Sequence, residues 1–103
     1  MRRAFYIGLL PFSLATVFAA AASATEAAYL CGDGRHVTAI FSPLDASASN
    51  VTLHFADPEV TLVLPQVLSA DGGRYADDRN EFWIKGRNAT LTHDGKTVAC
   101  QTN

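Results

Sequence analysis

The chain has 103 residues, of which 49% are hydrophobic, and its formal net charge is −2 at pH 7. This length accommodates one small domain, and an acidic domain is repelled by nucleic acid and by anionic membrane surfaces, so neither is an expected partner. A basic protein partner suits the charge better, although net charge also serves simply to keep a domain soluble.

The N-terminal segment has the pattern of a secretory signal peptide. Arg2 and Arg3 form a short positive start, residues 4–22 carry no charge, and Ala22-Ser23-Ala24 is a small-residue cleavage motif. The alternative is a retained membrane anchor, since an apolar run of about 20 residues can span a bilayer. A proline and a serine inside the run argue against the anchor.

These observations predict a signal peptide at residues 1–24 and a mature domain at residues 25–103, exported to the periplasm. No membrane span is expected once the signal is removed. A lipid anchor on Cys31 is not expected either, because the bulky Leu30 next to it does not suit the lipoprotein peptidase. Loss of the two N-terminal arginines also makes the mature domain more acidic than the whole chain.

The chain contains two cysteines, Cys31 and Cys100, one near each end of the predicted domain. An even number of cysteines in a small exported domain predicts a disulfide, which compensates for a small hydrophobic core. A metal-binding pair or two free thiols are the alternatives. No second CxxC motif or paired histidine lies near either cysteine, so the disulfide is the better prediction.

Three segments alternate between apolar and polar residues, the period of a half-buried strand. The segments are 37–41, 51–55 and 60–64. A turn is predicted at Asp57-Pro58, between the second and the third. The apolar sets are Val37, Ala39 and Phe41; Val51, Leu53 and Phe55; and Val60, Leu62 and Leu64.

Asp94-Gly95 separates two further β-rich runs, 89–93 and 96–100, which is a strong hairpin signal. No window keeps a helical repeat over three turns, and turn residues recur about every ten residues. The pattern predicts an all-β domain, either a sandwich or a barrel. We expect a small antiparallel β-barrel of about eight short strands closed by one disulfide, because a barrel leaves no exposed edge.

No constellation of residues indicates catalysis. His36, His54 and His93 are scattered without the short spacing of metal ligands, so no metal site and no cofactor are expected. The serines have no evident base beside them, and both cysteines are assigned to the disulfide. The sequence is typical of a binding protein and not of an enzyme, and it does not indicate an oligomeric state.

Several short motifs occur in a characteristic order along the predicted domain. They are Tyr29-Leu30-Cys31, Gly34, Ser69-Ala70-Asp71-Gly72-Gly73-Arg74-Tyr75, Phe82-Trp83-Ile84-Lys85-Gly86, Ala89 and Cys100. In this order, in a secreted domain with two cysteines, they resemble the MliC/PliC family of bacterial inhibitors of C-type lysozyme. The resemblance extends from Tyr29 to Cys100. It implies an eight-stranded antiparallel barrel that plugs the substrate cleft of lysozyme and so protects peptidoglycan.

The resemblance also implies which residues bind lysozyme. Gly72 and Tyr75 match the family's S-G-x-x-Y loop, and Lys85 with Gly86 matches its lysine-glycine motif. Two positions depart from the family pattern. Asp71 stands where the family has serine, and Ile84 stands where a small hydroxylated residue is usual. The first departure bears on which lysozyme is the target.

The chemistry of C-type lysozyme gives a physical reason for a lysine at position 85. C-type lysozyme uses two catalytic carboxylates, and an ammonium on a flexible stem is able to pair with them in a water-poor cleft. Alternation places Lys85 on the same face as Trp83 and Glu81, with Phe82 and Ile84 opposite. Trp83 is therefore expected to support the lysine stem or to pack at the rim of the contact. The alternative for Lys85 is an ordinary strand-end lysine that protects an edge.

Asp71 allows several interpretations. It repels an ionised catalytic carboxylate, but it also accepts a hydrogen bond from a protonated one, or pairs with Lys85 or Arg74, or serves as a turn residue. Ser69 is expected to supply the missing hydroxyl. Tyr75 belongs either to the contact surface or to the core.

Two other functions remain open. A small barrel can carry a hydrophobic or haem-like ligand, although the interior of a short eight-stranded barrel is just filled by side chains. The third possibility is a purely structural envelope domain.

Overall fold

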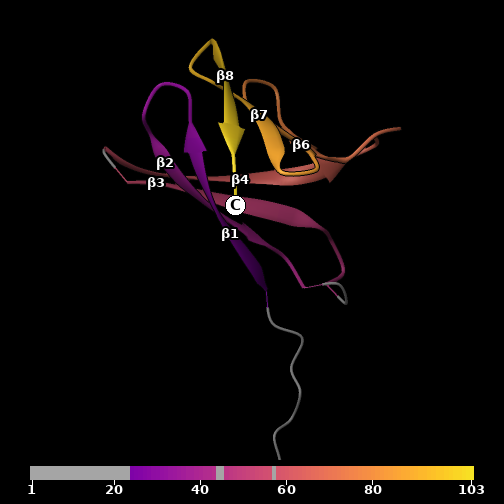
Figure 1. Cartoon of the computed structure of the whole chain (residues 1–103). Helices are drawn as coiled ribbons and strands as arrows, with labels where there is room; N and C mark the ends of the chain where they lie inside the picture. The colour runs from indigo at the N-terminus through magenta and orange to yellow at the C-terminus, as the bar shows by residue number, and fades with distance from the viewer. Residues whose placement is uncertain (1–23, 44–45, 57) are drawn as a thin grey trace, which may run out of the picture.

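The computed structural model describes residues 24–43, 46–56 and 58–103. In these ranges the chain forms eight antiparallel strands in sequence order, and they close into a barrel (Figure 1). The strands are β1 (Thr25–Cys31), β2 (His36–Phe41), β3 (Asn50–Ala56), β4 (Glu59–Val67), β5 (Gly73–Ala76), β6 (Glu81–Lys85), β7 (Asn88–His93) and β8 (Lys96–Gln101). The structure therefore confirms the predicted barrel and excludes the sandwich.

The alternation in the sequence decides which side chains fill the barrel. Val51, Leu53 and Phe55 of β3 are buried, whereas His54 between them is exposed. The apolar sets of β2 and β4 point inward in the same way, and each is buried or packs against the core. All three predicted faces are thus confirmed.

The core occupies the inside of the barrel. Phe82 is fully buried, and its ring packs against that of Tyr29 in a T-shaped arrangement with 5.1 Å between centroids. The buried apolar side chains come from all eight strands. They are Tyr29, Cys31, Val37, Ala39, Val51, Leu53, Phe55, Leu64, Tyr75, Phe82, Ala89, Leu91 and Cys100. An interior filled in this way is what a barrel of eight short strands is expected to have.

The Asp94-Gly95 turn forms as predicted. Asp94 has φ of 55° and Gly95 has φ of 73°, the positive values that a two-residue hairpin of type I′ requires at both central positions. Ala56 and Glu59 are paired partners where β3 meets β4. Asp57, half of the other predicted turn, lies outside the described residues.

The first and last strands meet at a short seam. β1 pairs with β8 at Leu30–Gln101 and Cys31–Cys100, and the second pair is joined by a disulfide across 69 positions of sequence. Both cysteines are almost fully buried. The predicted disulfide is therefore confirmed, and it lies at the place where the sheet closes on itself.

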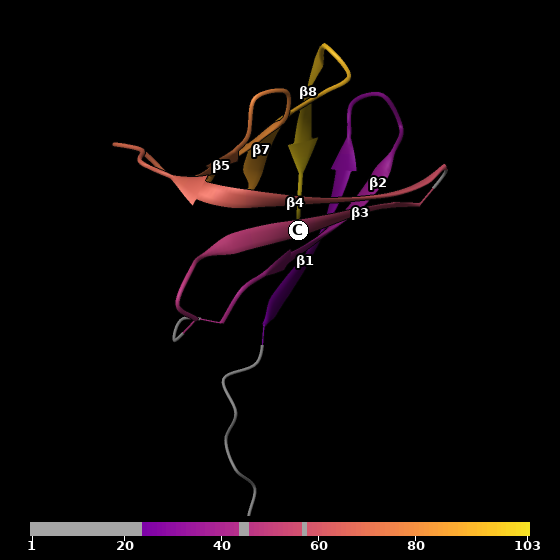
Figure 2. The ribbon, with the colours of Figure 1, turned by 180° about the vertical axis from the view of Figure 1, so that it is seen from behind.

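Because consecutive strands run antiparallel, the connections between them alternate between the two ends of the barrel. We call one end the motif end; it carries the connections β2–β3, β4–β5 and β6–β7. The β4–β5 connection projects from the body of the barrel, as Figure 1 and the reverse view in Figure 2 both show. Both sequence motifs, Ser69–Tyr75 and Lys85-Gly86, border connections at this end.

The position of the disulfide leads to a prediction about stability. Replacing both Cys31 and Cys100 by alanine should lower the free energy of unfolding by about 4 kcal/mol, because the unfolded chain regains the entropy of an open loop. Urea unfolding followed by circular dichroism measures this difference, and the reduced wild-type protein should behave like the double variant. Equal stability of the oxidised protein and the variant would contradict a stabilising role for the bond.

Candidate functional site

Lys85 is the last residue of β6 and points outward at the motif end. The side chain is exposed, and its Nζ lies 4.3 Å from the centroid of the Trp83 ring. Phe82 is fully buried and Ile84 packs against the core, so the alternation of β6 is as predicted. Gly86 follows with φ of 64°, a left-handed conformation that turns the chain directly after the lysine.

The β4–β5 connection folds onto the end of β6. Gly72 has φ of 70°, and a Cβ at this position would overlap the carbonyl oxygen of Ile84. Only glycine allows the two backbones to approach so closely. The conformation of the connection is also set locally: the Ser69 hydroxyl donates to the Asp71 carbonyl oxygen at 2.7 Å and accepts from the Asp71 amide at 3.2 Å.

Asp71 is the residue that links the two motifs. Its carboxylate Oδ2 lies 3.8 Å from Lys85 Nζ, and its carbonyl oxygen accepts a 2.7 Å hydrogen bond from Trp83 Nε1. Of the interpretations that the sequence allowed, the structure shows Asp71 both in a turn and beside Lys85. The two groups are about half exposed or more, so their attraction is weakened by solvent.

Arg74 has a different partner. Its Nε donates to Glu81 Oε2 at 2.6 Å, and its guanidinium carbon lies 5.2 Å from the centroid of the Trp83 ring. Because β5 and β6 pair at Arg74–Trp83, these side chains share the outer face of the barrel. The Trp83 indole therefore has two cations near its ring, Arg74 from β5 and Lys85 from β6.

Tyr75 lies in the core. Its side chain is 9% exposed and its ring is 5.7 Å from that of Phe41. Burial raises the pKa of the Tyr75 phenol above its ordinary value, because the ionised form loses its hydration. Of the two interpretations open in the sequence, the structure shows the core position, in which the Tyr75 ring packs near Phe41.

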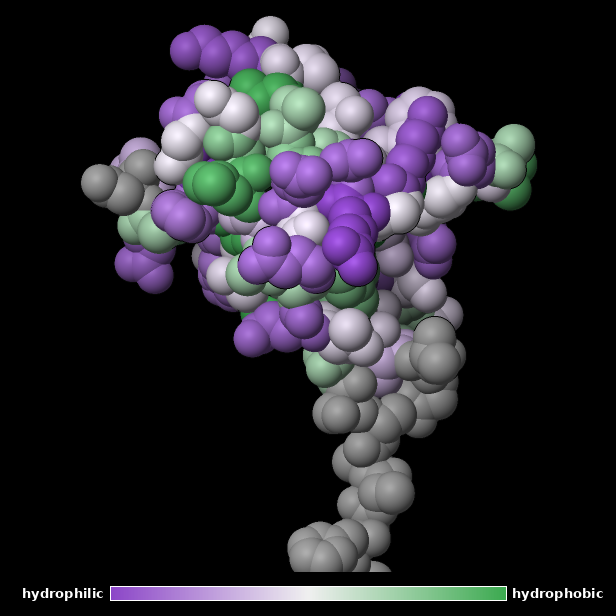
Figure 3. All heavy atoms as spheres, viewed as in Figure 1, coloured by the Kyte–Doolittle hydropathy of each residue, from purple (hydrophilic) through white to green (hydrophobic). Residues whose placement is uncertain are grey.

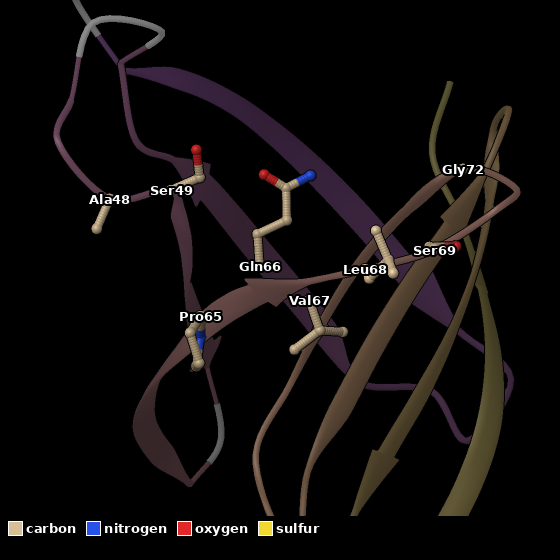
Figure 4. A pocket seen from close by; sticks show the side chains of 8 residues that line it. All are labelled: Ala48, Ser49, Pro65, Gln66, Val67, Leu68, Ser69 and Gly72. Carbon is tan, nitrogen blue, oxygen red and sulfur yellow. The ribbon is translucent and has the colours of Figure 1, made fainter.

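A groove of about 580 Å³ runs beside the projecting connection, and sequence reasoning did not anticipate it. It is lined by Ala48, Ser49, Pro65, Gln66, Val67, Leu68, Ser69 and Gly72 (Figure 4). Leu68 is 95% exposed, and Figure 3 shows hydrophobic atoms at the tip of this connection. The only signal in the sequence was a leucine at position 68, directly after the last residue of β4, where a polar turn residue is more common.

The three histidines lie apart from this site. His54 Nδ1 is 2.9 Å from the Thr61 hydroxyl, and His93 Nδ1 is 2.8 Å from Asn80 Oδ1. Among the described residues, no group of three or more His, Cys, Asp or Glu side chains is placed to hold a metal ion. Within the same ranges, the structure contains no helix long and apolar enough to cross a membrane.

Comparison with solved structures finds a close match in fold. The chain is similar to Pseudomonas aeruginosa MliC, crystallised in complex with hen egg white lysozyme. The two have a TM-score of 0.65 and 31% sequence identity, over 93% of this chain and 99% of that chain.

Comparison of sequences gives the same family. Over 37 residues, the chain is 43% identical to the membrane-bound lysozyme inhibitor of C-type lysozyme from Yersinia enterocolitica serotype O:8 / biotype 1B (strain NCTC 13174 / 8081). That match covers 36% of this chain and 32% of the relative, about a third of each. Residues 29–99 match the protein family described as "Membrane-bound lysozyme-inhibitor of c-type lysozyme". The chain therefore belongs to the MliC family.

Proposed function

We propose that this protein inhibits C-type lysozyme by inserting the motif end of its barrel into the substrate cleft of the enzyme. The observation that carries the proposal is the meeting of two motifs at that end, with Lys85 Nζ and Asp71 Oδ2 3.8 Å apart. The name of the Yersinia relative and the lysozyme complex of the Pseudomonas relative support the same target.

Lys85 is the residue that we assign to the catalytic carboxylates. Its ammonium is exposed on a long stem at the end of a strand, with a glycine turn behind it. A catalytic centre of one protonated and one ionised carboxyl group offers such a cation two acceptors. Removal of water on binding strengthens these charge-assisted hydrogen bonds relative to those on an open surface.

Asp71 changes the electrostatics of this contact. In the free protein its carboxylate lies close to the Lys85 ammonium and partly balances its charge. In the complex the same carboxylate faces two catalytic carboxyl groups, one of which is ionised, so it opposes binding unless the protonated group donates to it. We therefore assign to Asp71 a role in discriminating between lysozymes, and to Ser69 and Gly72 the shape of the loop.

The remaining matched residues are given supporting roles. Gly86 turns the chain after Lys85, and Arg74 packs at the rim over Trp83. Tyr75 acts from the core, since its side chain is almost fully buried. The protein acts as a binder and not as an enzyme. A ligand carrier is not favoured, because inward-pointing side chains fill the barrel in the described residues.

We further propose that the protein is exported and free in the periplasm. β1 begins at Thr25, directly after the predicted cleavage motif, which supports removal of residues 1–24. Both cysteines of the sequence are joined in the disulfide, which leaves no thiol on Cys31 for a lipid.

Intact-mass spectrometry of the protein from a bacterial envelope fraction should give the mass of residues 25–103 without an acyl group. A mass increased by a diacylglycerol group would overturn this assignment.

Replacing Lys85 by alanine should weaken inhibition by at least about tenfold, because the cleft then receives no ammonium. A cell-wall lysis assay, in which a C-type lysozyme is titrated with oxidised inhibitor, measures the loss. Lys96→Ala is the matched control, since Lys96 is the other lysine of the chain and lies in the β7–β8 hairpin at the opposite end. Equal inhibition constants for Lys85→Ala and the wild type would remove Lys85 from the mechanism.

Replacing Asp71 by serine should leave inhibition of an ordinary C-type lysozyme unchanged or make it stronger. The change removes the carboxylate that opposes the catalytic pair, and it keeps the backbone carbonyl that Trp83 binds. The same lysis assay, run with both variants against one lysozyme, makes the comparison. A large loss of inhibition would instead show that the Asp71 carboxylate itself makes a necessary contact with the enzyme.

A further inference from the structure

Trp83 is the single tryptophan of the chain, and it contacts both motifs. Its Nε1–H donates to the Asp71 carbonyl oxygen at 2.7 Å, and Lys85 Nζ lies 4.3 Å from its ring centroid. One side chain therefore holds the β4–β5 connection with its N–H group and the ammonium of β6 with its π face.

Each contact restrains a group that would otherwise be mobile. A lysine side chain loses rotamer entropy when it is fixed, and a cation held near an aromatic face has already lost part of that freedom. The hydrogen bond from Trp83 is accepted by the backbone carbonyl oxygen of Asp71, so it holds the loop whatever side chain stands at position 71.

The indole has a third neighbour in Arg74. The guanidinium carbon of Arg74 lies 5.2 Å from the ring centroid, and Arg74 Nε donates a 2.6 Å hydrogen bond to Glu81. The barrel interior beneath β6 is filled by Phe82, which is fully buried on the opposite face. Exchange of Trp83 therefore changes the outer surface and leaves the core packing in place.

We propose that Trp83 is a positioning residue, which holds the Ser69–Gly72 loop and Lys85 in the arrangement that enters the lysozyme cleft. This inference rests on the proposed function. Trp83 raises the affinity for lysozyme by ordering the two motifs before binding, so that less conformational entropy is lost when the complex forms. Trp83 acts through Asp71 and Lys85 and does not itself need to touch the catalytic groups.

Two substitutions separate the two contacts. Trp83→Phe keeps an aromatic face for Lys85 but has no N–H for the Asp71 carbonyl, and it should weaken lysozyme binding roughly fivefold. Trp83→Leu loses both contacts and should weaken binding roughly twentyfold. Val63→Ala is the control for loss of exposed apolar surface, because Val63 is 59% exposed on β4 and pairs with Thr52.

A double-mutant cycle distinguishes positioning from a direct contact. If Trp83 acts in part through Lys85, Trp83→Leu should cost clearly less in a Lys85→Ala background than in the wild type. Fully additive losses of binding free energy would overturn the assignment. If Trp83 only contacted lysozyme directly, its replacement would lower the affinity by the same factor in either background. Calorimetric titration of each variant into hen egg white lysozyme gives the dissociation constants.

A second measurement needs no lysozyme. Amide relaxation by nuclear magnetic resonance should show residues 69–72 ordered in the wild type and mobile in Trp83→Phe, with the strands of the barrel unchanged. An equally ordered loop in both proteins would overturn the inference. If the wild type fails to bind any C-type lysozyme, the proposed function fails, while the relaxation data still decide whether Trp83 orders the loop.

Discussion

Closure of the barrel at the β1–β8 seam is the constraint on which the rest of the structure depends. The first and last strands pair over a short stretch, and the Cys31–Cys100 disulfide joins them at that point. Once the sheet is closed, every strand has one inner and one outer face, and no residue can change face without a shift of register. The buried position of Phe82 and the outward position of Trp83 and Lys85 are then two consequences of one arrangement.

The site is built where two backbones come close at the motif end. Gly72 packs under the carbonyl of Ile84, which brings a projecting loop to the end of a neighbouring strand. The same approach places the Asp71 carboxylate beside the Lys85 ammonium and the Asp71 carbonyl within reach of the indole. The protein combines a barrel with a protruding loop, so the shape of the loop is decided by a few contacts and not by the core.

The core and the proposed binding surface occupy different faces of the same strands. Inward residues such as Tyr75 and Phe82 hold the barrel together, whereas outward residues such as Arg74, Trp83 and Lys85 form a connected polar and aromatic surface. Alternation allows the outer set to vary without disturbing the inner one. The Asp71 carboxylate therefore changes the chemistry of the outer surface without any change in the core.

The sequence by itself determined β2, β3, β4, β7 and β8, the inner faces of the first three, the Asp94-Gly95 hairpin and the pairing of the two cysteines, because each of these follows from local periodicity, a turn motif or a count. It also predicted the face of Lys85, since alternation needs only its neighbours in β6. Only the tertiary structure decided that Tyr75 is in the core, that Asp71 lies beside Lys85 while Arg74 pairs with Glu81, and that the Trp83 N–H reaches the Asp71 carbonyl. These last features depend on how separate strands and a loop pack against one another, and no local pattern encodes that packing.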